Sequence, residues 1–236
     1  MYSFLNWTFK RIICLILEPI VTYKNFLKPK PSFIYGKPIN SVNFDSVRKF
    51  KYNNNGYVKK FILSKREIKL IINEVKSGKH HKKFEKFNIS NPHINFISIY
   101  ETSSLNMEDK KKSIYANFWH TDDTLYPSCV KIFQLGEKIS DDHGPMEFID
   151  RENTKINWVK FFFRGNILKY NKGIKKFKSP SSSLFLDTRS CLHRAGIPKK
   201  NNTRKMLMIQ VINKKGPEDI DKIFSIQGFT EPTLLK

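Results

Sequence analysis

The sequence predicts a mostly β protein with flanking α-helices, built on a double-stranded β-helix core of the jelly-roll, cupin-like kind. Two observations support this fold class. The second half of the chain contains many short runs of β-branched and aromatic residues, which are typical of strands, and clusters of Gly, Pro, Ser and Asp separate them. One helical stretch, residues 155–164, interrupts the series. Many short strands with one inserted helix favour a jelly roll or a related double-stranded β-helix.

The expected strands share short length and β-branched or aromatic content. They cover residues 94–100, 114–118, 129–135, 146–149, 184–187 and 206–212.

The first half of the chain carries a clear helix start. Ser64 precedes Glu67 by three residues, which is the spacing of a capping box. The helix is expected to run to about Ser77, with Gly78 as its stop. His80 and His81 follow in a Lys-rich stretch that we expect to be a solvated loop.

The N-terminal segment is expected to be an extension of the main domain. Residues 2–18 predict a short helix, and prolines stiffen the connector that follows because each proline fixes φ. We therefore divide the chain into an extension and Pro-rich connector over residues 1–31 and one double-stranded β-helix domain over residues 32–236. The apolar run at residues 12–17 is shorter than the roughly 20 residues that span a bilayer. Two alternatives stay open for this helix: peripheral contact with an anionic membrane, or docking on the main domain.

The composition is strongly basic, with 43 Lys+Arg against 21 Asp+Glu and a formal net charge of +22. This balance suits an anionic substrate, a membrane surface or nucleic acid. A second interpretation stays open, because an AT-rich genome gives this Lys-rich composition without selection for any partner. The charge is spread along the chain and Lys far outnumbers Arg, whereas nucleic-acid binders concentrate charge in a stripe, so nucleic acid is not the expected partner.

Three cysteines, Cys14, Cys129 and Cys191, fit neither a disulfide framework nor a zinc site. We therefore expect a cytoplasmic protein, with the inner membrane surface as its possible peripheral contact.

Three residues are candidate metal ligands. His120 and Asp122 follow an expected strand, and in an extended segment residues i and i+2 point to the same side. His193 follows a later strand and is the best candidate for a third ligand. Two histidines and one carboxylate form the facial triad of non-haem Fe(II) oxygenases. Asp123 is an alternative to Asp122, but it would face the other side of the segment.

Two residues are candidates for holding a co-substrate. Arg204 opens the last long strand, and its guanidinium could grip the far carboxylate of an α-keto acid with two hydrogen bonds. Gln134 shares one side of its strand with Val130 and Ile132, so we predict it as a polar group of the pocket. Lys131 lies on the opposite side of that strand.

Four pieces of the sequence together resemble the phytanoyl-CoA dioxygenase-like 2-oxoglutarate oxygenases over roughly residues 90–215. The pieces are Trp119-His120-Thr121-Asp122-Asp123, Gly144-Pro145-Met146-Glu147-Phe148-Ile149, Leu184-Phe185-Leu186-Asp187-Thr188-Arg189 with His193-Arg194-Ala195-Gly196, and Arg204. The resemblance implies a double-stranded β-helix, Fe(II), 2-oxoglutarate and O2. It implies that His120, Asp122 and His193 bind the metal and that Arg204 binds the 2-oxoglutarate carboxylate. Asp150-Arg151-Glu152-Asn153 and Ser190-Cys191 depart from the family pattern.

The resulting expectation is an Fe(II)- and 2-oxoglutarate-dependent dioxygenase that hydroxylates a small-molecule, lipid-linked or sugar-linked metabolite. Related halogenases lack the carboxylate ligand, so Asp122 favours hydroxylation. One alternative is a cupin-like metal-binding protein without oxygenase activity, for which Arg204 would have no keto acid to hold. The other is a basic protein that binds membranes or nucleic acid. A fold without a central barrel would exclude the oxygenase and the cupin together.

Overall fold

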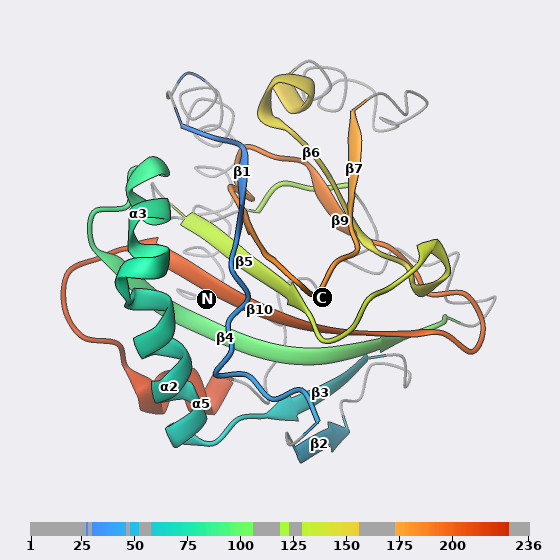
Figure 1. Ribbon diagram of the computed structural model, residues 1–236, viewed down its shortest axis with the longest axis horizontal. Coiled ribbons are helices and arrows are strands. Elements are labelled where there is room, and N and C mark those ends of the chain that lie inside the picture. Colours follow the sequence, from blue (N-terminus) through green and yellow to red (C-terminus); the bar gives the residue numbers. More distant parts are fainter. Residues whose placement is uncertain are drawn as a thin grey trace, which may run out of the picture.

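The structure, a computed structural model, describes residues 27, 30–45, 48–51, 58–105, 119–122, 129–155 and 173–226. The strands in these residues form two antiparallel sheets. The larger sheet contains, in spatial order, β1 (Phe33–Gly36), β8 (Ser183–Leu186), β5 (Cys129–Leu135), β10 (Thr203–Asn213), β4 (Pro92–Ser103), β3 (Val58–Ile62) and β2 (Arg48–Lys51). The smaller sheet contains β7 (Ile174–Phe177), β6 (Met146–Ile149) and β9 (His193–Ala195). Figure 1 shows β6, β7 and β9 beside one end of the larger sheet.

The order of the strands identifies a double-stranded β-helix. After β5 the chain leaves the larger sheet for β6 and β7, returns for β8, leaves again for β9 and returns for β10. His120 continues the smaller sheet through an isolated antiparallel bridge to His193. The expected fold class, mostly β with a jelly-roll core, is therefore confirmed.

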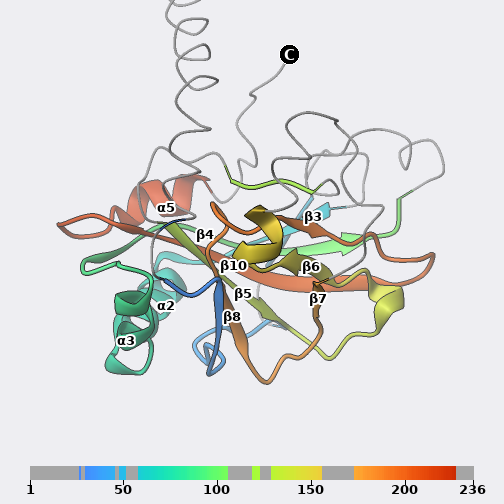
Figure 2. The same cartoon turned by 90° about the horizontal axis from the view of Figure 1, so that it is seen from above.

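Among the described residues, three helices cover the outer face of the larger sheet (Figures 1 and 2). They are α2 (Lys65–Lys76), α3 (Gly78–Lys86) and α5 (Ile220–Ile226). The capping box is confirmed, because Glu67 N donates to Ser64 Oγ and the Glu67 carboxylate accepts from Ser64 N. No helix in the described ranges is long and apolar enough to cross a membrane.

The prediction of a solvated loop after this helix is wrong. Gly78 opens a second helix, α3, after a one-residue break at Ser77. His80 lies in that helix, is 1% exposed and stacks on Phe185 with ring centroids 5.7 Å apart. A Lys-rich helix that buries few residues has the composition of a loop, which explains the error.

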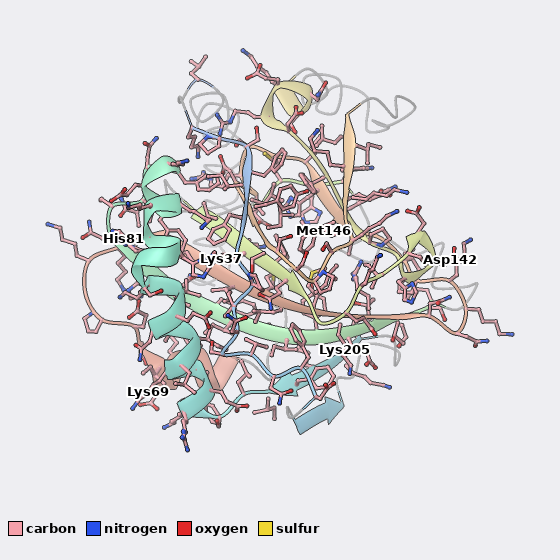
Figure 3. The ribbon with its side chains drawn as sticks, viewed as in Figure 1. Lys37, Lys69, His81, Asp142, Met146 and Lys205 are labelled. Atoms are coloured by element: carbon pink, nitrogen blue, oxygen red, sulfur yellow. The ribbon has the colours of Figure 1, made fainter. Side chains whose placement is uncertain are left out.

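Two apolar clusters lie on opposite faces of the larger sheet. Alternate residues of β5 divide between them: Val130 and Ile132 pack with the helices, whereas Phe133 and Leu135 face the smaller sheet. Met146 of β6 belongs to the second cluster, and Figure 3 shows it near the middle of the molecule. The second cluster is the interior of the barrel.

The expected strands 129–135 and 146–149 have the bounds of β5 and β6, and 94–100 and 206–212 lie within β4 and β10. The expected strand 184–187 begins and ends one residue earlier, as β8. The expected helix 2–18, the strand 114–118 and most of the helix 155–164 lie outside the described residues. The shorter strands β1, β2, β3, β7 and β9 were not expected.

Candidate metal centre

The structure brings the three predicted ligands together inside the barrel. One donor atom from each of His120, Asp122 and His193 lies within 4.8 Å of the others. The Nε2 atom of His193 is 3.7 Å from Asp122 Oδ1, and the centroids of the two imidazole rings are 4.4 Å apart. This is the donor set of a facial triad, which leaves the opposite side of an octahedral ion open.

The backbone of the smaller sheet creates this convergence. His120 N donates to His193 O at 3.1 Å, and His193 N donates to His120 O at 2.9 Å. The two histidines therefore lie directly opposite each other, which puts their side chains on the same face. Asp122 lies two residues after His120 and shares that face, as expected from the alternation of extended chains.

A hydrogen bond fixes the orientation of the His193 ring. His193 Nδ1 is 3.1 Å from the carbonyl oxygen of Cys191, which can only accept, so Nδ1 carries the proton. Nε2 is then left with its lone pair toward Asp122, the arrangement in which a histidine binds a metal. Burial lowers the pKa of His193 to about 4, with His120 and Lys131 acting in the same direction and Asp122 opposing them. The ring is therefore neutral at physiological pH.

Lys131 is a fourth member of the cluster that the sequence did not predict. It projects from β5 into the barrel, and its Nζ lies 2.7 Å from Asp122 Oδ2. Burial alone would raise the pKa of Asp122, but Lys131 and His193 outweigh it, so this pKa lies well below its usual value. The Lys131 pKa shows the matching effect: burial lowers it, and Asp122 more than compensates. Asp122 is therefore a carboxylate, the form that binds metal ions.

Gln134 does not join the cluster, which corrects its prediction as a pocket residue. Its side chain accepts hydrogen bonds from Ile39 N at 2.6 Å and Ser183 Oγ at 2.9 Å, and it donates to Ile39 O at 3.2 Å. Gln134 thus lies on the helix-covered face and ties the segment after β1 to β5. It does share its side with Val130 and Ile132, but that side faces away from the barrel.

Arg204 is completely buried at the start of β10. Its Nη1 donates to the carbonyl oxygens of Gly144 and Gly196, the latter at 3.3 Å. Its Nε has no hydrogen-bond partner among the described residues. Arg204 and Lys131 both act on Tyr100. Burial raises the pKa of Tyr100, and the two cations act to lower it. Arg204 therefore offers a buried donor with unused capacity.

Two glycines shape the surroundings of Arg204. Gly144 has a φ of +60°, in the left-handed region, and a Cβ there would collide with the backbone at Ile197. A Cβ on Gly196 would lie 2.5 Å from the carbonyl oxygen of Pro145. Only glycine lets these two segments approach closely enough for both carbonyls to reach one guanidinium. The Gly-Pro and Ala-Gly motifs thus have a steric role beside the site.

Arg194 lies on the outer face of the smaller sheet. It forms hydrogen bonds to Glu147 at 2.6 and 2.7 Å and lies 4.8 Å above the ring of Trp119. A cleft of about 220 Å³ adjoins Arg194 and Glu147, with Lys176 on its rim. Arg194 is therefore paired with the largely buried Glu147 carboxylate, on the face of β9 opposite to His193. Asp123 lies outside the described residues.

One of the similar solved structures, HygX, supports the fold. HygX from Streptomyces hygroscopicus, solved with nickel, 2-oxoglutarate and hygromycin B bound, is 8% identical, with 80% of this chain and 85% of HygX covered at a TM-score of 0.51. The non-heme alpha ketoglutarate dependent epimerase SnoN from nogalamycin biosynthesis is 8% identical, covering 83% and 84% at 0.48. An oxidoreductase of the 2OG-Fe(II) oxygenase family from Burkholderia pseudomallei is 8% identical, covering 79% and 86% at 0.48.

No family model matches the chain, and no curated protein matches it in sequence. At this identity the similarity to HygX concerns the fold alone. The resemblance to the phytanoyl-CoA dioxygenase-like branch stays a prediction. The chain has the fold of HygX, with a His-Asp-His cluster inside its barrel.

Proposed function

We propose that the protein is an Fe(II)- and 2-oxoglutarate-dependent dioxygenase that hydroxylates a small-molecule, lipid-linked or sugar-linked metabolite. The convergence of His120, Asp122 and His193 inside the barrel carries the proposal. Two imidazoles and one carboxylate suit Fe(II), and no fourth ligand joins them within the described ranges. The sequence pieces around the site favour the phytanoyl-CoA dioxygenase-like branch of this class.

The residues present fit both groups. His193 is held neutral and Asp122 ionised, so both are in the form that binds a metal. Arg204 is permanently charged, and its buried Nε lacks a partner among the described residues, which suits an entering carboxylate. When bound, the iron supplies O2 activation coupled to oxidation of 2-oxoglutarate. The chain supplies the orientation of the ligands, the cationic clamp and a buried interior.

The balance of charge inside the barrel supports an anionic primary substrate. Among the groups proposed to hold the metal and 2-oxoglutarate and their ion-pair partners, Lys131 and Arg204 are cations and Asp122 is a carboxylate. A divalent metal and the doubly negative 2-oxoglutarate would cancel each other, so one positive charge of this group would remain. A carboxylated or phosphorylated substrate would neutralise it, because buried charge is costly unless paired.

The decisive experiment adds Fe(II) and then 2-oxoglutarate to the protein without oxygen. A weak metal-to-ligand charge-transfer band should appear in the visible spectrum and should be absent in His120→Ala. Arg204→Met should bind the metal normally but need far more 2-oxoglutarate to develop the band. Arg194→Met is the matched control, because it removes a guanidinium from the outer face and should leave the band unchanged.

Each other outcome has a distinct meaning. Well-folded protein that binds Fe(II) but gives no band would contradict the oxygenase proposal and favour a cupin-like metal-binding protein. Protein that binds no divalent metal would contradict both. If the band forms, succinate production with a panel of anionic metabolites tests the substrate class, and equal turnover of neutral analogues would contradict an anionic substrate.

A further inference from the structure

The turn between β8 and β9, residues 187–191, supports two of the three metal-binding candidates. The carbonyl oxygen of Thr188 accepts from Asp122 N at 2.9 Å. The carbonyl oxygen of Cys191 lies 3.1 Å from His193 Nδ1. One short segment therefore sets both the position of the carboxylate and the rotation of the imidazole ring.

Asp187 holds this turn in shape. Its carbonyl oxygen accepts from Ser190 N at 3.1 Å and from Cys191 N at 3.0 Å. Its side chain is completely buried and accepts a short hydrogen bond from Ser190 Oγ. A buried carboxylate costs several kcal/mol unless cations or donors surround it. The conformation of the turn thus depends on what neutralises Asp187.

Two buried cations surround that carboxylate. Lys30 Nζ lies 2.7 Å from Asp187 Oδ2, and the Lys30 side chain is 2% exposed. An Nη2 atom of Arg151 lies 3.4 Å from the same oxygen. Arg151 also donates to the carbonyl oxygens of Lys30 at 2.5 Å and Pro31 at 3.0 Å, and to Ser190 Oγ at 3.2 Å. Lys30 thus makes the shorter ion pair, and Arg151 holds the backbone that carries it.

Backbone bonds complete the attachment of the connector. Asp187 N donates to Ser32 O at 3.0 Å, and Arg151 N donates to Ser32 Oγ at 2.9 Å. Residues 30–32, here called the strap, are therefore fastened to the turn by both side chain and backbone. The expected domain boundary after residue 31 falls within this strap and stays a prediction.

We propose that Lys30 is a positioning residue for the metal centre, acting through Asp187 and the 187–191 turn on Asp122 and His193. The inference rests on the proposed metal-binding function. Lys30 contacts no candidate ligand itself. Its ammonium keeps the Asp187 carboxylate in place, and the turn then presents its two carbonyls at the correct positions. Partners of metal ligands commonly change metal affinity about 10- to 100-fold when they are removed.

Lys30→Met tests the proposal, because it keeps most of the length of the side chain and removes its charge. Arg151 and Ser190 still contact Asp187 in this variant, so the carboxylate is not left alone and the chain should fold. Lys30→Arg keeps the charge and should rescue. Lys76→Met is the matched control, since Lys76 forms an ion pair of similar length, 2.8 Å, with Glu218 on the helical side.

Nickel affinity is measured on the full chain by isothermal titration calorimetry, well below each variant's unfolding temperature. We expect Lys30→Met to bind nickel about 10- to 100-fold more weakly. Lys30→Arg and Lys76→Met should bind like the parent. A second measurement needs no metal: the ¹⁵N resonances of the His193 ring should lose the signature of a fixed Nδ1–H tautomer in Lys30→Met alone.

Unchanged nickel affinity and an unchanged His193 tautomer in folded Lys30→Met would overturn the proposal while leaving the proposed function intact. If the parent chain binds no nickel, the proposed function fails, and the His193 resonances still decide the role of Lys30. If Lys30→Met does not fold, Lys30→Gln replaces it, because it removes the charge of the ion pair with Asp187 but keeps a polar donor at this position. It should shift both measurements in the same direction, and no shift would overturn the proposal.

Discussion

Removing Lys131 should destabilise the metal-free protein and make it unusually dependent on metal. Lys131→Met leaves the buried Asp122 carboxylate without its cation, 2.7 Å away in the parent. Breaking a buried pair costs about 3–5 kcal/mol, and the partial exposure of both side chains, 16% and 13%, points to the lower end. About 3 kcal/mol corresponds to a fall in Tm of about 6–12 °C for a chain of this size. A divalent metal at Asp122 replaces the missing charge, so nickel should raise the Tm of the variant more than that of the parent.

The assay is thermal unfolding followed by circular dichroism, in chelator and in excess nickel. Lys176→Met is the control, because it removes an exposed ion pair with Asp141 and should leave the Tm unchanged. A Tm for Lys131→Met that equals the control in chelator would refute the reasoning. So would an equal nickel-induced rise in the variant and the parent, because Lys131 would then not be compensating Asp122.

Three further predictions follow from other parts of the structure. The pKa of His193 falls from 6.5 to about 4 on folding, so between these pH values the unfolded chain binds a proton that the folded chain does not. The stability of the metal-free protein should therefore fall by about 3 kcal/mol as the pH is lowered from 6.5 to 4. Urea titrations should show a weaker dependence of stability on pH for His193→Gln. Gly196→Ala should lower stability by about 2 kcal/mol and weaken 2-oxoglutarate binding, because its Cβ meets Pro145 O at 2.5 Å, whereas Gly78→Ala, with nothing within 4 Å, should be neutral or stabilising. Ser64→Ala should cost about 1 kcal/mol in urea unfolding by removing the cap of α2, and an unchanged midpoint would show that the cap adds nothing.

The sequence predicted that His120 and Asp122 lie together because the geometry of this pair is local. The i, i+2 spacing of His120 and Asp122 places both on one face of any extended segment, wherever that segment lies. The capping box at Ser64 is equally local, since it needs only four residues. These parts of the structure follow from chain geometry and do not depend on distant contacts.

The choice between Gln134 and Lys131 could not be made from the sequence. Alternation shows which residues of β5 share a face, but both faces of this strand are buried, one by helices and one by the smaller sheet. Hydrophobic patterning therefore gives no sign of which face is the interior of the barrel. Lys131 was not expected to point into the barrel. Its burial is explained by its ion pair with Asp122, and only the tertiary fold brings these two residues together.

The attachment of Lys30 to Asp187 left no signal in the sequence either. A lysine in a Pro-rich connector has the composition of a solvated linker, and its partner is far along the chain. Strand β9 was missed for a related reason: three residues that include a charged arginine are too few to show alternation, and pairing with β6 defines the strand.

The position of β10 has a consequence for how the protein assembles. This strand is the last of those described, yet it lies in the centre of the larger sheet, between β5 and β4, where Arg204 pairs opposite Thr102. Pairing of such distant segments is slow, because the entropy of closing the intervening loop is lost before the contacts form. The barrel interior therefore closes only when nearly the whole domain has been synthesised. Metal capture should be a late kinetic event in folding, and the rate at which a chain acquires nickel would report completion of the barrel.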